Sequence, residues 1–144
     1  MNSNRSDPFS ESPKRMSLVD QISRSDDTTD VINVSAALAR MGGDAGLLAD
    51  VAGFFLEDAP ELMSQMRVAV RDQRGAELAH AAHTLKGLAS NFDAVFVQKL
   101  AAELESRGFA GRFEGTDSML EELEREAGRV EQALKEHVLP LHRS

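Results

Sequence analysis

The chain contains no cysteine, no tryptophan and no tyrosine. Without cysteine it can form neither a disulfide bond nor a thiolate metal site. Aromatic residues make up only 5% of the 144 residues, whereas hydrophobic residues as a whole make up 42%, which is enough for a core. The second half is rich in Ala, Leu, Glu and Arg, which are strong helix formers. This composition predicts an all-α protein with one domain and a tail.

Basic clusters and long apolar runs are also missing. The formal net charge is −8, and nucleic-acid-binding domains usually present a basic face, so we expect no nucleic-acid partner. The opening residues lack the apolar run of a signal peptide, and no later segment is long enough to span a bilayer. We therefore expect no membrane association and a cytoplasmic protein.

Residues 1–29 differ in composition from the rest of the chain. They are rich in Ser, Asp, Asn and Arg and can bury little apolar surface, which predicts a flexible N-terminal tail. A short helix within this tail remains open, because a few apolar residues cluster there: Met16, Leu18, Val19 and Ile22. The helical domain is expected at residues 30–144.

Apolar residues recur at helical spacing along residues 30–144. A short amphipathic segment over 34–41 is stopped by Gly42 and Gly43, and Asp44 then matches a helix N-cap. The segment 45–71 contains Pro60, so it is either two helices or one long kinked helix. Its apolar stripe includes Leu47, Leu48, Phe54 and Phe55, and the pattern does not tell which of them leave the core.

Three further segments complete the pattern. The helix expected over 76–91 has core positions separated by steps of four and three: Leu78, Ala82, Leu85, Ala89 and Phe92. Asp93 is interpreted as the N-cap of the next helix, which ends around Gly108 and Gly111, and Thr116 as the cap of the last one. Four amphipathic segments with short connections predict an antiparallel four-helix bundle with a short extra N-terminal helix.

The stretch around His83 carries the candidate chemistry. At about 100° per residue, His83 points away from Leu85 and the rest of the apolar stripe, with Lys86 and Gly87 beside it. Glycine inside a helix costs up to about 1 kcal/mol relative to alanine, so Gly87 needs a reason: close approach of another helix, or access to the imidazole. Its place opposite the apolar stripe favours access. An exposed imidazole is a competent nucleophile, so the patch suits a phosphohistidine.

A longer motif extends this patch. Ala82-His83-Thr84-Leu85-Lys86-Gly87 is followed by Ala94, Leu100, Leu104, Glu105 and Gly108. This pattern resembles that of histidine phosphotransfer (HPt) domains, the relay modules of multistep phosphorelays, with the run 38–44, Phe55 and Pro60 adding to the likeness upstream. The resemblance covers residues 32–138.

The resemblance implies a role for each site residue. His83 would be the phosphoacceptor, Lys86 would position and neutralise the phosphoryl group, and Gly87 would keep the ring accessible. Glu105 would accept the imidazole Nδ1–H and leave Nε2 free to attack. The chain departs from the family at Asp93, where glycine is common, and the extra charge there could alter the choice of partner.

The function that the resemblance implies is a phosphorelay intermediate. It would accept a phosphoryl group from a receiver-domain aspartate on His83 and pass it to another receiver aspartate. Its partners would be response-regulator receiver domains and a hybrid histidine kinase. Mg²⁺ is expected in the receiver, whereas this chain is expected to bind no cofactor or metal. We also expect the chain to be a monomer. A Gly-rich phosphate loop is missing, which predicts a phosphotransfer protein without autonomous kinase activity.

Two alternatives belong to other classes. The chain could be a non-catalytic helical adaptor that binds receiver domains, or a fragment of a hybrid sensor kinase, although its Met1 start favours a free-standing protein. His80 and His83 also have a spacing that can chelate a metal, but the His-Glu-x-x-His arrangement is missing. We therefore interpret His80 as a partly exposed neighbour of the site.

Overall fold

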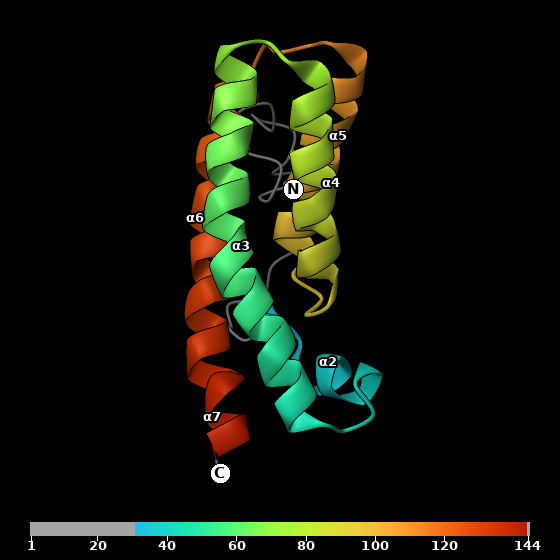
Figure 1. Ribbon diagram of the computed structural model, residues 1–144, viewed down its shortest axis with the longest axis vertical. Helices are drawn as coiled ribbons and strands as arrows, with labels where there is room; N and C mark the ends of the chain where they lie inside the picture. Colours follow the sequence, from blue (N-terminus) through green and yellow to red (C-terminus); the bar gives the residue numbers. More distant parts are fainter. Residues whose placement is uncertain (1–30, 144) are drawn as a thin grey trace, which may run out of the picture.

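The computed structural model describes residues 31–143, and this part of the chain is helical without strands (Figure 1). The four long helices are α3 (Ala45–Arg71), α4 (Gly75–Ser90), α5 (Val95–Ala110) and α6 (Thr116–His137). Two short helices flank them, α2 (Val34–Arg40) and α7 (Leu139–Arg143). The predicted tail at 1–29 lies outside the described residues.

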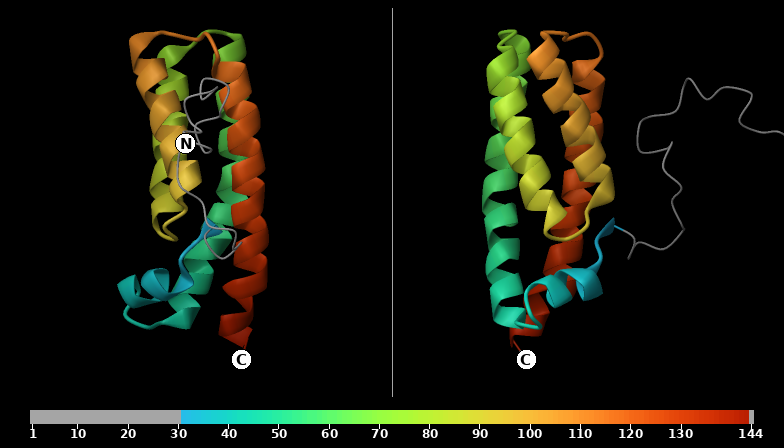
Figure 2. Two further views of the ribbon diagram at one scale, coloured as in Figure 1. Left: turned by 180° about the vertical axis from the view of Figure 1, so that it is seen from behind. Right: turned by 90° about the vertical axis from the view of Figure 1, so that its right-hand side faces the viewer.

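The four long helices form an antiparallel bundle, as predicted. Each helix packs on the next one in the chain, and α6 closes the ring by packing on α3 as well as on α5. In Figure 1, α3 and α4 lie side by side at the front, and the view from behind in Figure 2 shows α5 and α6. The short helix α2 lies across one end. The part of the chain from 31 to 143 has no helix long and apolar enough to cross a membrane.

Helix α3 is a single helix of 27 residues that contains Pro60. Proline has no N–H to donate to the carbonyl four residues earlier, and its ring crowds that carbonyl. The helix tolerates this because Pro60 lies on its exposed side, and α3 bends in the half that leads to α2 (Figure 1). Of the two possibilities that the sequence left open, the single long helix is therefore correct.

The ends of the helices confirm some of the predicted caps. The side chain of Asp44 accepts a hydrogen bond from the backbone N–H of Leu47 at 3.0 Å. Gly42 and Gly43 both have positive φ, which ends α2 as predicted. Gly111 is the left-handed C-cap of α5, with φ of 69°. Gly108, by contrast, lies inside α5 and does not mark its end.

Two predicted caps were wrong. The N-cap of α5 is Ala94, whereas Asp93 adopts φ of +54°, a conformation that a helix N-cap does not use. This explains why glycine suits position 93, since only glycine adopts a positive φ without steric cost. Thr116 is the first residue of α6, and its hydroxyl donates to the carbonyl of Phe113 instead of capping the helix.

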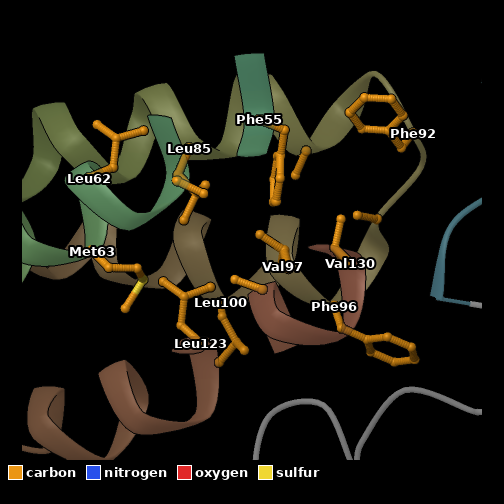
Figure 3. Packing of buried hydrophobic residues seen from close by; sticks show 14 of the residues in the cluster. Phe55, Leu62, Met63, Leu85, Phe92, Phe96, Val97, Leu100, Leu123 and Val130 are labelled. Carbon is orange, nitrogen blue, oxygen red and sulfur yellow. The ribbon is translucent and has the colours of Figure 1, made fainter. Parts of the chain in front are cut away.

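The core lies along the axis of the bundle (Figure 3). All five predicted core positions around α4 are fully buried, and the rings of Phe55 and Phe92 meet edge to face with centroids 6.2 Å apart. On α3, Leu48 and Phe55 are buried, while Leu47 and Phe54 leave the core. Because the five core positions around α4 are buried, the residues on the opposite side of α4 face solvent.

Candidate functional site

The outward face of α4 presents His83 to solvent. Its side chain is 66% exposed, whereas Ala82 and Leu85 on either side of it are fully buried. Residues two apart on a helix point in nearly opposite directions, so burial of Leu85 directs the imidazole outward. The predicted orientation of His83 is therefore present in the structure.

Glu105 of α5 connects the candidate residues of α4. One carboxylate oxygen of Glu105 lies 2.9 Å from Nδ1 of His83, and the other accepts a hydrogen bond from Nζ of Lys86 at 2.7 Å. The carboxylate is mostly buried, with 16% of the side chain exposed. The structure thus brings His83, Lys86 and Glu105 into one network across the α4–α5 interface.

The charge of Glu105 determines which ring nitrogen of His83 carries the proton. The hydrogen bond from Lys86 lowers the pKa of Glu105, and the hydrogen bond to His83 acts in the same direction, against the opposing effect of burial. An ionised carboxylate can only accept hydrogen bonds. Nδ1 of a neutral imidazole must therefore carry the proton and Nε2 the lone pair, the form in which Nε2 can act as a nucleophile.

Gly87 lies one helical turn beyond His83 and is exposed. Among residues 31–143, a Cβ placed on Gly87 would have no atom within 4 Å apart from its chain neighbours and the backbone of its own helix. Close approach of another helix, one of the two explanations for this glycine, is therefore excluded at this position. Gly87 therefore leaves open space beside the imidazole, and a bulky group on Nε2 could occupy this space.

Close helix approach does occur between Gly75 of α4 and Gly108 of α5. A Cβ on Gly108 would lie 2.6 Å from the carbonyl oxygen of Gly75 and 2.8 Å from the backbone nitrogen of Ala79. A Cβ on Gly75 would collide with the carbonyl of Gly108 in the same way. Because Gly108 lies three residues after Glu105, this contact fixes the position of Glu105 relative to α4.

Arg40 of α2 holds the turn that joins α4 to α5, a contact that the sequence did not predict. Its guanidinium donates to the carbonyl oxygen of Asn91 at 3.1 Å and forms an ion pair with Asp93. A cation at the C-terminal end of α4 also interacts favourably with the helix dipole. Asp93 therefore anchors α2 to this turn. One indication of this contact was present in the sequence, namely Asp93 at a position where glycine is common in the pattern that the chain resembles.

An open groove of about 520 Å³ runs between α3 and α4 beside the site. It is lined by Glu61, Ser64, Gln65, Val68, Ala76, Glu77 and His80. His80 is exposed, as expected for a neighbour of the site. Within residues 31–143 there is no cluster of three or more side chains suited to hold a metal ion.

The chain is similar to known proteins in its sequence and in its fold. The model of the Hpt domain family matches residues 50–134. The fold is similar to the crystal structure of histidine-containing phosphotransfer protein B (HptB) from Pseudomonas aeruginosa PAO1, with a TM-score of 0.68 and 23% sequence identity. That similarity covers 74% of this chain and 92% of the other. No curated protein matches the chain.

Proposed function

The chain belongs to the Hpt domain family and is a histidine phosphotransfer intermediate of a phosphorelay, and we propose that His83 carries the phosphoryl group. The observation that supports this assignment most directly is the 2.9 Å contact between Nδ1 of His83 and Glu105. It orients an exposed imidazole with its Nε2 lone pair available, beside the open space at Gly87.

The transfer step requires little beyond this geometry. Nε2 of His83 attacks the phosphorus of an aspartyl phosphate, an N–P bond forms, and the P–O bond to the aspartate breaks to release a carboxylate. The ring retains its Nδ1 proton and becomes cationic as the bond forms, so the negative charge of Glu105 stabilises it. The reverse sequence passes the phosphoryl group to an aspartate of a second receiver.

Lys86 is the residue that we propose acts on the phosphoryl group. Its ammonium has three protons, and the hydrogen bond to Glu105 uses one of them. The remaining donors can meet the phosphoryl oxygens, whose negative charge must be stabilised during transfer. We propose that Lys86 orients and neutralises the incoming group, and that Gly87 admits it.

The partner class follows from the family, since Hpt proteins exchange phosphate with receiver domains of response regulators. We propose that the receiver supplies Mg²⁺ and the acidic pocket, so that this chain needs no cofactor of its own. One of the receivers would belong to a hybrid histidine kinase. A monomeric state is supported by the bundle, because the long apolar stripes of its helices are largely covered within one chain.

One labelling experiment tests the assignment of His83. Receiver domains from the source genome are phosphorylated with radiolabelled acetyl phosphate and incubated with the wild type, with His83→Gln and with the matched control His80→Gln. We expect acid-labile, alkali-stable label on the wild type and on His80→Gln, and none on His83→Gln. Label that persists on His83→Gln would place the acceptor elsewhere. A wild type that binds receivers but never takes label would favour the non-catalytic adaptor.

A further inference from the structure

The face of α3 beside the site carries three exposed apolar residues and one exposed acidic residue. Positions 47, 54, 61 and 68 are separated by seven residues and therefore lie along one face of the helix. Leu47, Phe54 and Val68 are exposed there at 45%, 55% and 42%. The remaining position is the exposed Glu61. Glu61 and Val68 also line the groove between α3 and α4.

The groove lies within the area that any phosphate donor must cover, an inference that rests on the proposed function. His80 lines the groove and precedes His83 by three residues, about 4.5 Å along the helix axis and on the same side. Even a small transient interface buries about 500 Å² per partner, which corresponds to a disc of about 13 Å radius. A receiver that brings its aspartate to His83 therefore also contacts the groove.

The lining of the groove has the chemistry to accept a cationic side chain. Two carboxylates line it, Glu61 and Glu77, and no Lys or Arg does. Val68 and Ala76 supply apolar surface, on which the methylene stem of a lysine or arginine can pack while its charged end reaches a carboxylate.

The two carboxylates differ in their present partners. Glu77 pairs with Arg74 at 3.2 Å, but both side chains are largely exposed, and such surface pairs contribute little. Glu61 has no ion pair among residues 31–143. Glu61 is therefore the carboxylate that a partner can bind without displacing a cation of this chain.

We propose that the receivers served by this chain place a lysine or arginine in the groove, and that Glu61 selects them. The apolar residues on either side of Glu61 would contact apolar surface of the same receiver. Exposed charges act mainly on the rate of association and on the choice of partner, and their effect weakens with salt. Glu61 would thus determine which receivers bind, without contacting the atoms that react.

Phosphotransfer kinetics provide the test. A panel of receiver domains from the source genome, each phosphorylated with acetyl phosphate, is assayed with the wild type, Glu61→Gln and Glu61→Lys. The control is Glu121→Lys, the same charge reversal at an exposed position of α6. For the receivers that the wild type prefers, we expect kcat/KM at low salt to fall about fivefold with Gln and at least about tenfold with Lys.

The other readouts separate recognition from chemistry. The transfer rate at saturating receiver should not change, and the salt dependence of kcat/KM should be weaker in Glu61→Gln than in the wild type. A Lys or Arg to Glu substitution in the receiver should restore transfer to Glu61→Lys. Unchanged kcat/KM for Glu61→Lys with every receiver that labels the wild type would overturn the role of Glu61 alone. A wild type that takes label from no receiver would overturn the proposed function and this inference together.

Discussion

The carboxylate of Glu105 meets Nδ1 of His83 at 2.9 Å across the interface between α5 and α4. The two residues are 22 positions apart in the sequence, so only the packing of the two helices brings them together. The contact selects one tautomer of the imidazole and holds the ring in one orientation.

Replacing Glu105 tests whether it acts by positioning His83. Glu105→Ala should slow transfer about ten- to a hundredfold, because a hydrogen bond to a charged group contributes about 1.5–3 kcal/mol. Glu105→Gln should slow transfer less than Glu105→Ala, since its amide oxygen still accepts the Nδ1–H but no longer carries the charge that stabilises the cationic ring. The ¹⁵N chemical shifts of His83 provide a readout that a merely structural role would not alter: they should report one tautomer in the wild type and a mixture in Glu105→Ala. Equal rates for the Ala and Gln variants would contradict this role.

Stability should depend on pH through the same residue. Lys86 lowers the pKa of Glu105 in the folded state, so the unfolded state binds a proton more readily. The stabilisation from Glu105 is therefore complete above the ordinary glutamate range, near pH 4.3, and is lost as the pH falls through the lower folded value. Urea unfolding of the wild type and Glu105→Gln should show a difference that is largest near pH 7 and shrinks below about pH 4. A difference independent of pH would contradict this linkage.

Gly87→Ala should separate stability from activity. No residue in the described part of the chain obstructs a Cβ at this position, and alanine is favoured over glycine in a helix by about 0.5–1 kcal/mol. Thermal unfolding should therefore show a more stable protein, while phosphotransfer should slow because the methyl group narrows the space beside His83. The matched control is Gly128→Ala on α6, where a Cβ is equally unobstructed; it should gain stability without loss of transfer. Faster or unchanged transfer in Gly87→Ala would show that the open space is not used.

Gly108→Ala should have the opposite effect on stability. Its methyl group would collide with the backbone of Gly75 and Ala79, and backbone cannot move aside as a flexible side chain can. Overpacking of this kind costs about 1–3 kcal/mol, so we expect a lower midpoint of urea unfolding. Transfer should slow as well, because a displaced α5 carries Glu105 away from His83. A variant as stable as the wild type would show that α4 and α5 can separate at little cost.

Periodicity was sufficient to predict the bundle and the orientation of its central helix. The stripe from Leu78 to Phe92 is buried as predicted, because helical spacing directly encodes which face is apolar. Periodicity could not predict that Leu47 and Phe54 are exposed, since the apolar stripe of α3 is wider than the part of α3 that contacts the core. Which residues lie at the edge of such a stripe depends on how neighbouring helices pack.

The misassigned cap at Asp93 and the partner of Lys86 have a common cause, since both depend on contacts that local sequence does not encode. An aspartate before a helix usually caps it, but Asp93 adopts a positive φ and binds Arg40 of α2 instead. The network of Glu105 depends on the register of α5 against α4, which the contact between Gly75 and Gly108 fixes. A family pattern could suggest these residues, whereas only three-dimensional packing brings them into contact.

The exposure of His83 has a consequence for how long a signal is stored. A phosphoryl group on Nε2 would stand largely in bulk water, because the side chain of His83 is 66% exposed among residues 31–143 and none of these residues fills the space beside it at Gly87. Its hydrolysis would then proceed at a rate set mainly by the N–P bond itself. The stored phosphate would pass to whichever of the receivers that this chain recognises is abundant and unphosphorylated, so the direction of flow would depend on the concentrations of those receivers.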